Sequence, residues 1–405
     1  MLSCPKHLVP SSLLALKEAP VPTLTMTEEQ KQIITMIRDF VKKDIEPVAS
    51  RMEQQDIYPE EIVKKLKELG LFGILISEEY GGMGLNVSTY AMIIEEISKG
   101  WMSISGIINS HLIMAYIVQN FGTPDQKRAW LPKMARGEKR GGVALTEPNT
   151  GSDVAAIQSF AVKQGNHYAI NGNKMMITNG EHGSTFAVLV KTDRQVQPAH
   201  RGISCFILEK GPGFKSGRHL DKLGYRGVDT SELIFEDHKA PADAIVGLKE
   251  GQGFKQMMVA MEVGRINVAS RAVGVATAAF EKAIAYAQQR KTFGVPIAEH
   301  QAIQLKLADM YTSIEASRLL VQHAAQKKDR GERSDLEAGM AKLFASETCA
   351  TVTLEAMRIH GGYGYFKEYV VERYYRDAPL MLIGEGTSEI QKLVIARNLL
   401  SMYAS

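Results

Sequence analysis

The sequence predicts an α+β protein in which a small antiparallel sheet domain lies between two helical domains. Three observations predict it. Apolar residues at helical spacing dominate residues 27–137, short β-type runs separated by Gly and Pro fill residues 138–250, and helical spacing returns over residues 251–405. A chain of 405 residues, 45% of them hydrophobic, can bury a large core in two or three subdomains. Residues 1–26 precede the first helical pattern and form an N-terminal extension.

The first helical domain begins at Thr27, where Thr-Glu-Glu-Gln has the form of a helix start. Apolar residues then recur at helical spacing, namely Ile33, Ile34, Ile37, Phe40 and Val41. Residues 60–71 repeat the pattern, and the glycine cluster at 81–84 ends it.

Residues 100–122 contain no Asp, Glu, Lys or Arg, so a membrane span must be considered. Polar residues interrupt this run, among them Asn109 and Gln119, and they would be costly in hydrocarbon. We therefore expect a buried helix and no membrane insertion.

The middle domain shows β-type runs. Residues 167–172 have the pattern of a strand followed by a tight turn. Further short runs cover residues 185–190, 203–208 and 232–235, with Gly and Pro between them. These runs predict a small antiparallel sheet.

The second helical domain begins with residues 251–290, which are rich in Ala, Gly and Val and so allow close packing of neighbouring helices. A second long helix is predicted around residues 303–324, and two more at about 335–359 and 387–402. Four helices in this order predict a helical bundle.

Composition excludes several classes of function. The formal net charge of +3 provides no strong field for nucleic acid or anionic lipid. The three cysteines are widely spaced and form neither a disulfide framework nor a metal cluster, which suits a reducing compartment. The first 25 residues lack arginine and a clean apolar signal core. We expect a cytoplasmic protein, with the mitochondrial matrix as the alternative if the extension is processed.

Glu385 is the main candidate for catalysis. It stands between Gly384 and Gly386, which let backbone and ligand approach closely. The hydroxyl pair Thr387-Ser388 follows, and either hydroxyl can cap the next helix. The positive end of that helix favours a phosphate. The segment therefore fits a base beside a phosphate-bearing ligand, although a solvated Glu in a surface loop would give the same pattern.

Other segments carry groups that can contact such a ligand. Thr146 offers a hydroxyl, and Gly151-Ser152 can wrap a phosphate with backbone N–H groups. Thr178 adds a second hydroxyl. Arg290 could grip a pyrophosphate, and Gly361-Gly362 could admit a nucleotide backbone. Each also has an ordinary interpretation, as a turn, a strand threonine, a cation at a helix end or a helix cap. None is a Walker loop or a Rossmann fingerprint, and no spacing suits a metal site.

Taken together, these segments resemble the acyl-CoA dehydrogenase family of flavoproteins over residues 27–402. Five motifs in order carry the resemblance: Thr146-Glu147-Pro148 with Gly151-Ser152-Asp153, Ile177-Thr178-Asn179-Gly180, Arg290-Lys291-Thr292-Phe293-Gly294, Gly361-Gly362-Tyr363-Gly364 and Glu385-Gly386-Thr387. The resemblance implies a helical N-terminal domain, a middle antiparallel β domain, a C-terminal four-helix bundle, bound FAD and a homotetramer.

The resemblance also implies roles for individual residues. Glu385 would be the catalytic base. The cofactor contacts would be Leu145, Thr146, Gly151, Ser152, Ile177, Thr178, Arg290, Thr292, Phe293, Gln301, Arg358, Gly361, Gly362, Thr387 and Glu389. The substrate contacts would be Ser152, Arg265, Gly384 and Gly386. Of these, Arg290, Thr292, Phe293, Gln301, Gly361 and Gly362 would hold the FAD of a neighbouring subunit.

A subset of the family carries its base on the long helix, immediately before the arginine matched here by Arg265. That position is Gly264 in this chain, and Glu262, two residues earlier, points to another helix face. The resemblance therefore assigns the base to Glu385.

The chemistry implied is α,β-dehydrogenation of an acyl-CoA. An apolar pocket raises the pKa of a carboxylate, so Glu385 becomes a better base for the α-proton. The Glu385 N–H and a flavin ribityl hydroxyl would bind the thioester oxygen. The β-hydrogen would pass as hydride to flavin N5, giving a trans-2-enoyl-CoA, and an electron-transfer flavoprotein would reoxidise the flavin.

Three positions depart from common members of the family. Met176 stands where a tryptophan often screens the flavin, and Arg358 stands where a glutamine often precedes the glycine pair. Gly384 replaces an aromatic residue beside the base, which leaves room at the α-carbon for a branched or cyclic acyl group. A dicarboxylic acyl group would need a cation in the pocket wall, and residues 101–112 contain no Lys or Arg. We therefore do not expect such a substrate.

Two alternatives remain open. One is a flavin oxidase or monooxygenase on the same fold, in which oxygen replaces the protein electron acceptor. The other is a nucleic-acid-associated relative without dehydrogenase activity, which would call for a basic stripe.

Overall fold

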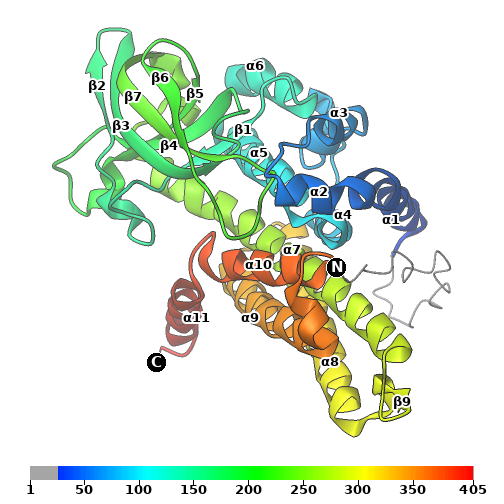
Figure 1. Cartoon of the computed structure of the whole chain (residues 1–405). Coiled ribbons are helices and arrows are strands. Elements are labelled where there is room, and N and C mark those ends of the chain that lie inside the picture. The colour runs from blue at the N-terminus through cyan, green and yellow to red at the C-terminus, as the bar shows by residue number, and fades with distance from the viewer. Residues whose placement is uncertain (1–25, 405) are drawn as a thin grey trace.

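The computed structural model describes residues 26–404, and the predicted extension up to residue 25 lies outside them. The order is helical, β and helical, as predicted (Figure 1). The sheet and the N-terminal helices lie next to each other, and the C-terminal helices lie beneath both in the view of Figure 1. Helix α7 runs from beneath the sheet into the C-terminal helices, so it connects the two ends of the molecule.

The N-terminal domain begins where the sequence predicted. Thr27 caps the first helix, and its hydroxyl accepts from the Gln30 N–H while the Gln30 side chain accepts from the Thr27 N–H. The helices of this domain are α1 Glu28–Phe40, α2 Glu46–Gln54, α3 Glu60–Glu68, α4 Val87–Gly100, α5 Met102–Phe121 and α6 Pro124–Ala135. A π-helical segment, Val41–Ile45, joins α1 to α2.

Helix α5 is a core helix. Among residues 26–404 it is the one helix that is long and apolar enough to cross a membrane, and most of it is buried inside the protein. Asn109 is buried and donates to another side chain, and Gln119 donates to the Leu75 carbonyl. Burial with satisfied polar groups is the behaviour of a helix inside a folded protein.

The sheet has seven strands in the order β1-β4-β2-β3-β7-β6, with β5 on the other side of β4. Its strands are β1 Gly141–Ala144, β2 Phe160–Gln164, β3 His167–Thr178, β4 Thr185–Lys191, β5 Ile203–Glu209, β6 Phe214–His219 and β7 Thr230–Pro241. Most pairs are antiparallel, but β1 and β2 both run parallel to β4, with Gly141 opposite Thr185 and Phe160 opposite Lys191. The purely antiparallel prediction is therefore wrong at these two pairings. The long connection between β1 and β4 permits a crossover that strand patterns alone do not reveal.

The predicted tight turn at Asn171-Gly172 is also wrong. Strand β3 continues through it, and a register shift against β7 lies there instead. Gly172 has φ = 140°, and a Cβ at this position would meet the Ser159 Oγ atom at 2.2 Å. The glycine thus marks a bulge and a close backbone approach within a strand.

The C-terminal domain is built on α7, Gly253–Gln289, whose 37 residues span about 55 Å. The other elements are the hairpin of β8 Lys291–Thr292 and β9 Val295–Pro296, followed by α8 Gln301–Asp329, α9 Asp335–His360, α10 Val371–Ile383 and α11 Ser388–Met402. Helices α7, α8 and α9 pack against one another, and α10 packs against α7 and α9. One apolar cluster joins these helices to α4 and α5.

Helix α10 was missed by the sequence prediction. Pro379 lies inside it, and a proline normally argues against a helix interior. Its buried residues nevertheless follow helical spacing, at Val371, Tyr374, Ala378 and Met381. The element matters for function because it ends at Ile383, directly before Glu385.

Candidate active site

Glu385 lies in the short loop between α10 and α11 (Figure 1). Its backbone has φ = 56°, a left-handed conformation that is uncommon for residues other than glycine. Gly386 follows with φ = 88°, so the chain turns sharply at two successive residues. Strained conformations of this kind persist only where the surroundings impose them, and they occur often at functional sites.

Lys342 of α9 stabilises this loop through two hydrogen bonds. Its Nζ atom donates to the Leu382 carbonyl at 3.2 Å and to the Gly386 carbonyl at 2.8 Å, one on each side of Glu385. The Lys342 side chain is fully buried, and burial lowers its pKa to about 8. Gln391 of α11 adds a hydrogen bond from Nε2 to the Gly386 carbonyl, at 3.0 Å. These contacts impose the unusual backbone of the loop.

The helix cap predicted after Glu385 is present. The Thr387 hydroxyl accepts from the Ile390 N–H at 3.3 Å, so Thr387 rather than Ser388 caps α11. Glu389, in the first turn, is exposed.

The Glu385 carboxyl group points into the protein, and its side chain is 18% exposed. Its Oε1 atom accepts from the Asn109 Nδ2 atom at 2.6 Å and lies 3.4 Å from the Arg271 Nη2 atom. Its Oε2 atom is buried and has no hydrogen-bond partner within the part of the chain that the structure describes. One oxygen of the carboxyl group is therefore fixed and the other is available.

Gly264 provides the space for this available oxygen. A Cβ at Gly264 would lie 2.1 Å from Glu385 Oε2 and 2.9 Å from the Ile113 Cδ1 atom. Any side chain at this point of α7 would displace the carboxyl group. The position at which some family members carry their base is thus, in this chain, the space that Glu385 uses.

Glu262 does not reach this site. Its Oε2 atom accepts from the Lys328 Nζ atom at 2.8 Å and from the Ser334 hydroxyl at 2.9 Å. Its carboxylate therefore serves contacts to α8 and to the start of α9, on another face of α7.

Burial raises the pKa of Glu385 above its ordinary value, because the charged form loses its hydration. Arg271, the hydrogen bond from Asn109, and the nearby Lys342 act in the opposite direction. Burial is the larger effect. A carboxylate with a raised pKa is a stronger base once it is ionised.

The Thr146 and Thr178 segments lie side by side. The Met175 N–H donates to the Thr146 carbonyl at 2.8 Å, which places the Thr146 segment beside the end of β3 that carries Thr178. Gly151 is close as well, since a Cβ there would lie 3.9 Å from the Thr146 Cγ2 atom. Both threonines are half-buried. Two motifs that are about thirty residues apart therefore lie together at one half-buried edge, with Ser152 exposed next to it.

Glu147, inside the first of these motifs, has a structural role. Its carboxylate accepts from the Lys174 Nζ atom at 2.8 Å and from the N–H groups of Gln158 and Ser159. Glu147 and Lys174 are both buried, and burial lowers the pKa of Lys174 to about 8. The pair fixes the turn that presents Thr146.

A contact path connects Thr178 to Glu385. The Tyr225 hydroxyl is a neighbour of Thr178, whose side chain acts to lower the pKa that burial of Tyr225 raises. That hydroxyl lies 3.5 Å from the Arg271 Nη1 atom, and Arg271 contacts Glu385. Gly106 of α5 leaves room for the tyrosine, since a Cβ there would lie 1.7 Å from its hydroxyl oxygen. The β domain and the C-terminal loop thus meet at one site.

Sequence reasoning missed the polar residues beneath Glu385. We call Tyr90, Asn109, Tyr225, Asn267 and Arg271 the Arg271 cluster; all five are buried. The Asn267 Nδ2 atom donates to the Tyr90 hydroxyl at 2.6 Å, and that hydroxyl donates to the Asn109 Oδ1 atom at 3.2 Å. The available signal was an asparagine and an arginine in the otherwise small and apolar middle of α7.

Arg265 also lies in this part of α7. It is buried, its Nε atom has no hydrogen-bond partner among residues 26–404, and burial lowers its pKa. Gly384 is partly exposed, and a Cβ there would lie 3.2 Å from the Leu380 carbonyl oxygen. A side chain at Gly384 would therefore start against the end of α10.

A second group of predicted residues lies far away, at the other end of α7. Gly264 and Arg290 are 26 residues apart, which is about 39 Å along a helix. Arg290 is exposed and its guanidinium lies 5.8 Å from the centre of the Tyr363 ring, next to Gly361 and Gly362. Arg290 and the glycine pair therefore form one surface patch.

Phe293 and its neighbours belong to the same end of the molecule. The Phe293 ring is 98% exposed and lies 6.0 Å from the ring of His300, whose Nε2 atom is 2.8 Å from the Thr292 hydroxyl. Gln301 begins α8 and is exposed. The structure does not bring these residues to Glu385 within one chain.

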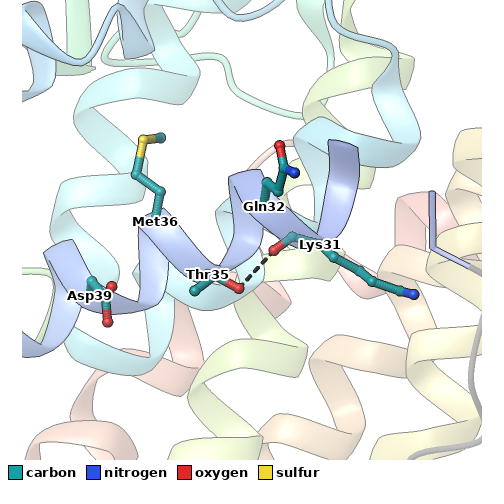
Figure 2. Close-up of a pocket in the computed structure, with 5 residues that line it drawn as sticks. All are labelled: Lys31, Gln32, Thr35, Met36 and Asp39. Atoms are coloured by element: carbon teal, nitrogen blue, oxygen red, sulfur yellow. Dashed lines mark hydrogen bonds between the residues drawn. The ribbon is translucent and has the colours of Figure 1, made fainter. Parts of the chain in front are cut away.

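Two surface hollows carry no part of this site. One follows the exposed face of α1, where Lys31, Gln32, Thr35, Met36 and Asp39 point away from the helix axis (Figure 2). The other is lined by polar residues around the ion pair of His182 with Asp229. Among residues 26–404, no group of three or more His, Cys, Asp or Glu side chains could hold a metal ion.

Comparisons with known proteins identify the family. Three models match in chain order: the acyl-CoA dehydrogenase N-terminal domain over residues 27–138, the middle domain over 142–238 and the C-terminal domain over 251–400. The chain belongs to the acyl-CoA dehydrogenase family. The resemblance inferred from the motifs is confirmed.

Individual relatives agree with the family models. The chain is 42% identical over 386 residues to the mitochondrial short-chain specific acyl-CoA dehydrogenase of Homo sapiens, covering 95% of this chain and 93% of that protein. It is 39% identical to butyryl-CoA dehydrogenase from Megasphaera elsdenii, with a TM-score of 0.91 and coverage of 93% and 100%. A solved structure described as the electron transferring flavoprotein of Acidaminococcus fermentans contains a chain 41% identical to this one, with a TM-score of 0.91 and coverage of 93% and 99%.

The protein is therefore an oxidoreductase of the acyl-CoA dehydrogenase type, with FAD as its cofactor. Its residues fit such a cofactor. Thr146 and Thr178 offer adjacent half-buried hydroxyls, and a bulge in β3 turns the Met176 side chain outward beside them. At the other end of α7, an added Cβ at Gly361 or Gly362 would meet nothing within 4 Å, so the backbone there is open to a nucleotide.

Proposed function

We propose that Glu385 is the base that removes the α-proton of a short acyl-CoA thioester. The observation that carries the proposal is the buried Oε2 atom, which has no partner among residues 26–404 and points into a space kept open by Gly264. The other oxygen is fixed by Asn109. A base held in one orientation with one free oxygen is pre-organised for proton transfer.

The Glu385 backbone supports the same reaction. Its N–H donates to no other group within the described chain, and the contacts of Lys342 hold its direction. In the reaction this N–H would donate to the thioester oxygen, where negative charge develops as the α-proton leaves. The bound FAD supplies the acceptor for the β-hydrogen and its electron pair, so the product is a trans-2-enoyl-CoA.

The cofactor contacts are proposed in two sets. Leu145, Thr146, Gly151, Ser152, Ile177 and Thr178 would lie at the flavin and phosphates of one subunit, with Thr387 and Glu389 near the phosphates. Ile177 is 3% exposed, so its contact would come from the backbone. Arg290, Thr292, Phe293, Gln301, Arg358, Gly361 and Gly362 would hold the nucleotide of a neighbouring subunit.

We propose a homotetramer from the family resemblance, and this division supports contact between subunits. Arg290 lies about 39 Å along α7 from Gly264, which faces Glu385, so one dinucleotide could not reach both ends within one chain. At the distal end the Phe293 ring is exposed, and so is the Tyr363 ring beside Arg290; exposed aromatic rings gathered at one end of the molecule favour an interface there.

For the acyl group, we propose a short chain, on the basis of the short-chain and butyryl-CoA relatives. Gly384 supports the further proposal that branching at the α-carbon is accepted, because the residue directly before Glu385 has no side chain. Ser152, Arg265, Gly384 and Gly386 are the proposed substrate contacts.

For the electron acceptor, we propose an electron-transfer flavoprotein, supported by the similar chain in a structure described as one. A cytoplasmic location and the domain limits near residues 137 and 250 are proposed from the sequence. The alternative is an oxidase or monooxygenase on the same fold.

The test is a spectral titration of the purified protein. Butyryl-CoA, 2-methylbutyryl-CoA and a cyclic acyl-CoA are added anaerobically, and bleaching of the flavin band is followed. We expect fast bleaching with short chains, with reoxidation that is fast with electron-transfer flavoprotein and slow in air. Absence of bleaching with every thioester would contradict the function, and fast reoxidation in air would favour the oxidase.

A further inference from the structure

Arg271 is a buried cation with one anionic partner. Its side chain is 5% exposed, and within residues 26–404 its one ion pair is with Glu385, at 3.4 Å. Its Nε atom is buried without a hydrogen-bond partner in that part of the chain, and its remaining polar contact is to the Tyr225 hydroxyl at 3.5 Å. A buried guanidinium needs an anion or a full set of hydrogen-bond acceptors. Arg271 has a single anion, and its set of acceptors is incomplete.

The proposed reaction removes even that partner. When Glu385 takes the α-proton of the substrate, its carboxylate becomes a neutral acid. Arg271 is then left without a counter-ion inside the protein, at the step that the enzyme must accelerate. An anion carried by the substrate would supply a counter-ion to Arg271 once Glu385 has become neutral.

The Arg271 cluster lies directly beside the proposed base. The Glu385 carboxyl group sits between Gly264 and Arg271 of α7 on one side and Asn109 of α5 on the other. A thioester whose α-carbon touches Glu385 would therefore have Arg271 within a few bonds of its acyl chain. In the same cluster the Asn267 Oδ1 atom is also buried without a partner in the described chain.

We propose that the enzyme takes acyl-CoA substrates whose acyl chain ends in a carboxylate, and that Arg271 binds that carboxylate. The inference rests on the proposed function and specifies its substrate. Arg271 reaches Glu385 directly, so the carboxylate must be only a few bonds from the α-carbon, as in succinyl-CoA or glutaryl-CoA. A guanidinium with Nε and Nη donors in one plane matches a carboxylate better than a single hydroxyl or carbonyl.

This proposal differs from the expectation drawn from the sequence, which stays untested. Residues 101–112 indeed contain no Lys or Arg, but they form only the α5 wall of the site. The cation comes from α7, which is more than 150 residues away in the chain and whose Arg271 contacts the same Glu385 carboxyl group.

Wild-type enzyme gives the first test. Flavin bleaching is measured with glutaryl-CoA and with pentanoyl-CoA, which has the same chain length without the charge. We expect glutaryl-CoA to have a kcat/KM about 10- to 100-fold higher, the range of a buried charge-assisted hydrogen bond. Isothermal titration with the product glutaconyl-CoA and with 2-pentenoyl-CoA should give the same order of affinity, and this readout needs no turnover.

Variants test whether the preference comes from Arg271. Arg271→Gln removes the charge and keeps an amide, so the preference for glutaryl-CoA should disappear or reverse. Arg271→Lys keeps the charge without the planar fork, so an intermediate preference is expected. Arg128→Gln on the exposed face of α6 is the matched control, because Arg128 contacts only Asp125 among the described residues. It should retain the wild-type ratio.

The outcomes separate this inference from the proposed function. If pentanoyl-CoA bleaches the flavin as well as or better than glutaryl-CoA, the carboxylate proposal is wrong while the dehydrogenase function stands. If Arg271→Gln lowers kcat/KM for both thioesters by the same factor, Arg271 acts on Glu385 alone and the proposal is again overturned. If no thioester bleaches the flavin, both the carboxylate proposal and the proposed dehydrogenase function are wrong. Should Arg271→Gln fail to fold, the wild-type comparison still decides.

Discussion

The two ends of helix α7 differ in how far their side chains are buried, and this difference matches the two roles proposed for them. At the Glu385 end, the carboxyl group is 18% exposed, held by Asn109, and surrounded by buried polar side chains. At the Arg290 end, the Phe293 ring is 98% exposed and the glycine pair faces open space. The proposed acid–base site is formed within one chain, whereas the proposed nucleotide-binding end is open.

This difference teaches how the two sets of motifs should be tested. Changes at the Glu385 end should alter the rate of the reaction and leave cofactor content unchanged. Changes at the distal end should lower cofactor content and leave the rate of the loaded enzyme unchanged, because about 39 Å of helix separates the two ends.

The largest effect is expected from Gly264→Ala. The added methyl group would lie 2.1 Å from Glu385 Oε2 and would push the base out of position. A displacement of about 1 Å can cost on the order of 100-fold in rate, so the bleaching rate with butyryl-CoA should fall at least that far. Gly339→Ala on α9 is the control, because its methyl group would meet its nearest neighbour at 3.5 Å, an ordinary contact. Equal rates for the two variants would show that Glu385 does not need this space.

At the other end, Phe293→Ser should reduce FAD retention and weaken subunit association, because it removes an exposed aromatic side chain from the proposed interface. The ratio of flavin to protein absorbance after gel filtration and the mass by light scattering report both properties. Molecules that keep FAD should bleach at the wild-type rate. If the variant keeps all its FAD and its mass is unchanged, the distal end does not form part of the cofactor site.

Lys342→Met should weaken the loop that carries Glu385. The variant keeps the side-chain volume but leaves the Leu382 and Gly386 carbonyls without their shared donor. The loss should be about 1–3 kcal/mol of unfolding free energy, measured by urea denaturation, together with a lower bleaching rate. If stability falls and the rate does not, Lys342 supports the fold without positioning the base.

The smallest and most specific effect concerns pH. Burial raises the pKa of Glu385, and Arg271 partly opposes that effect. The base acts only when deprotonated, so kcat/KM with butyryl-CoA should rise with pH through this raised pKa and then level off. Removing the cation in Arg271→Gln should shift that rise to higher pH. A shift to lower pH, or none, would mean that Arg271 does not act on the ionised carboxylate.

Local signals made much of this structure predictable. The Thr27 capping box, the long apolar pattern of α7 and the Thr387 cap depend on residues close in sequence, and all three are present. The parallel pairing of β1 with β4 and the helix through Pro379 depend on tertiary context, and both were missed.

The site shows the same division. Glu385 could be singled out because its glycines and the following cap lie within a few residues of it. The contribution of Arg271 could not, because its importance comes from a contact across 114 residues of chain. The space at Gly264 was likewise invisible, since a glycine in a sequence does not say what fills the place of its side chain.

Rapid mixing of Glu385→Gln, loaded with FAD, against butyryl-CoA tests the central assignment most directly. The amide keeps the size of the side chain but cannot accept the α-proton, so bleaching should slow by at least about 100-fold while FAD content and the unfolding midpoint stay close to those of the wild type. Bleaching at the wild-type rate would mean that another group takes the proton, and the account of this site would be wrong.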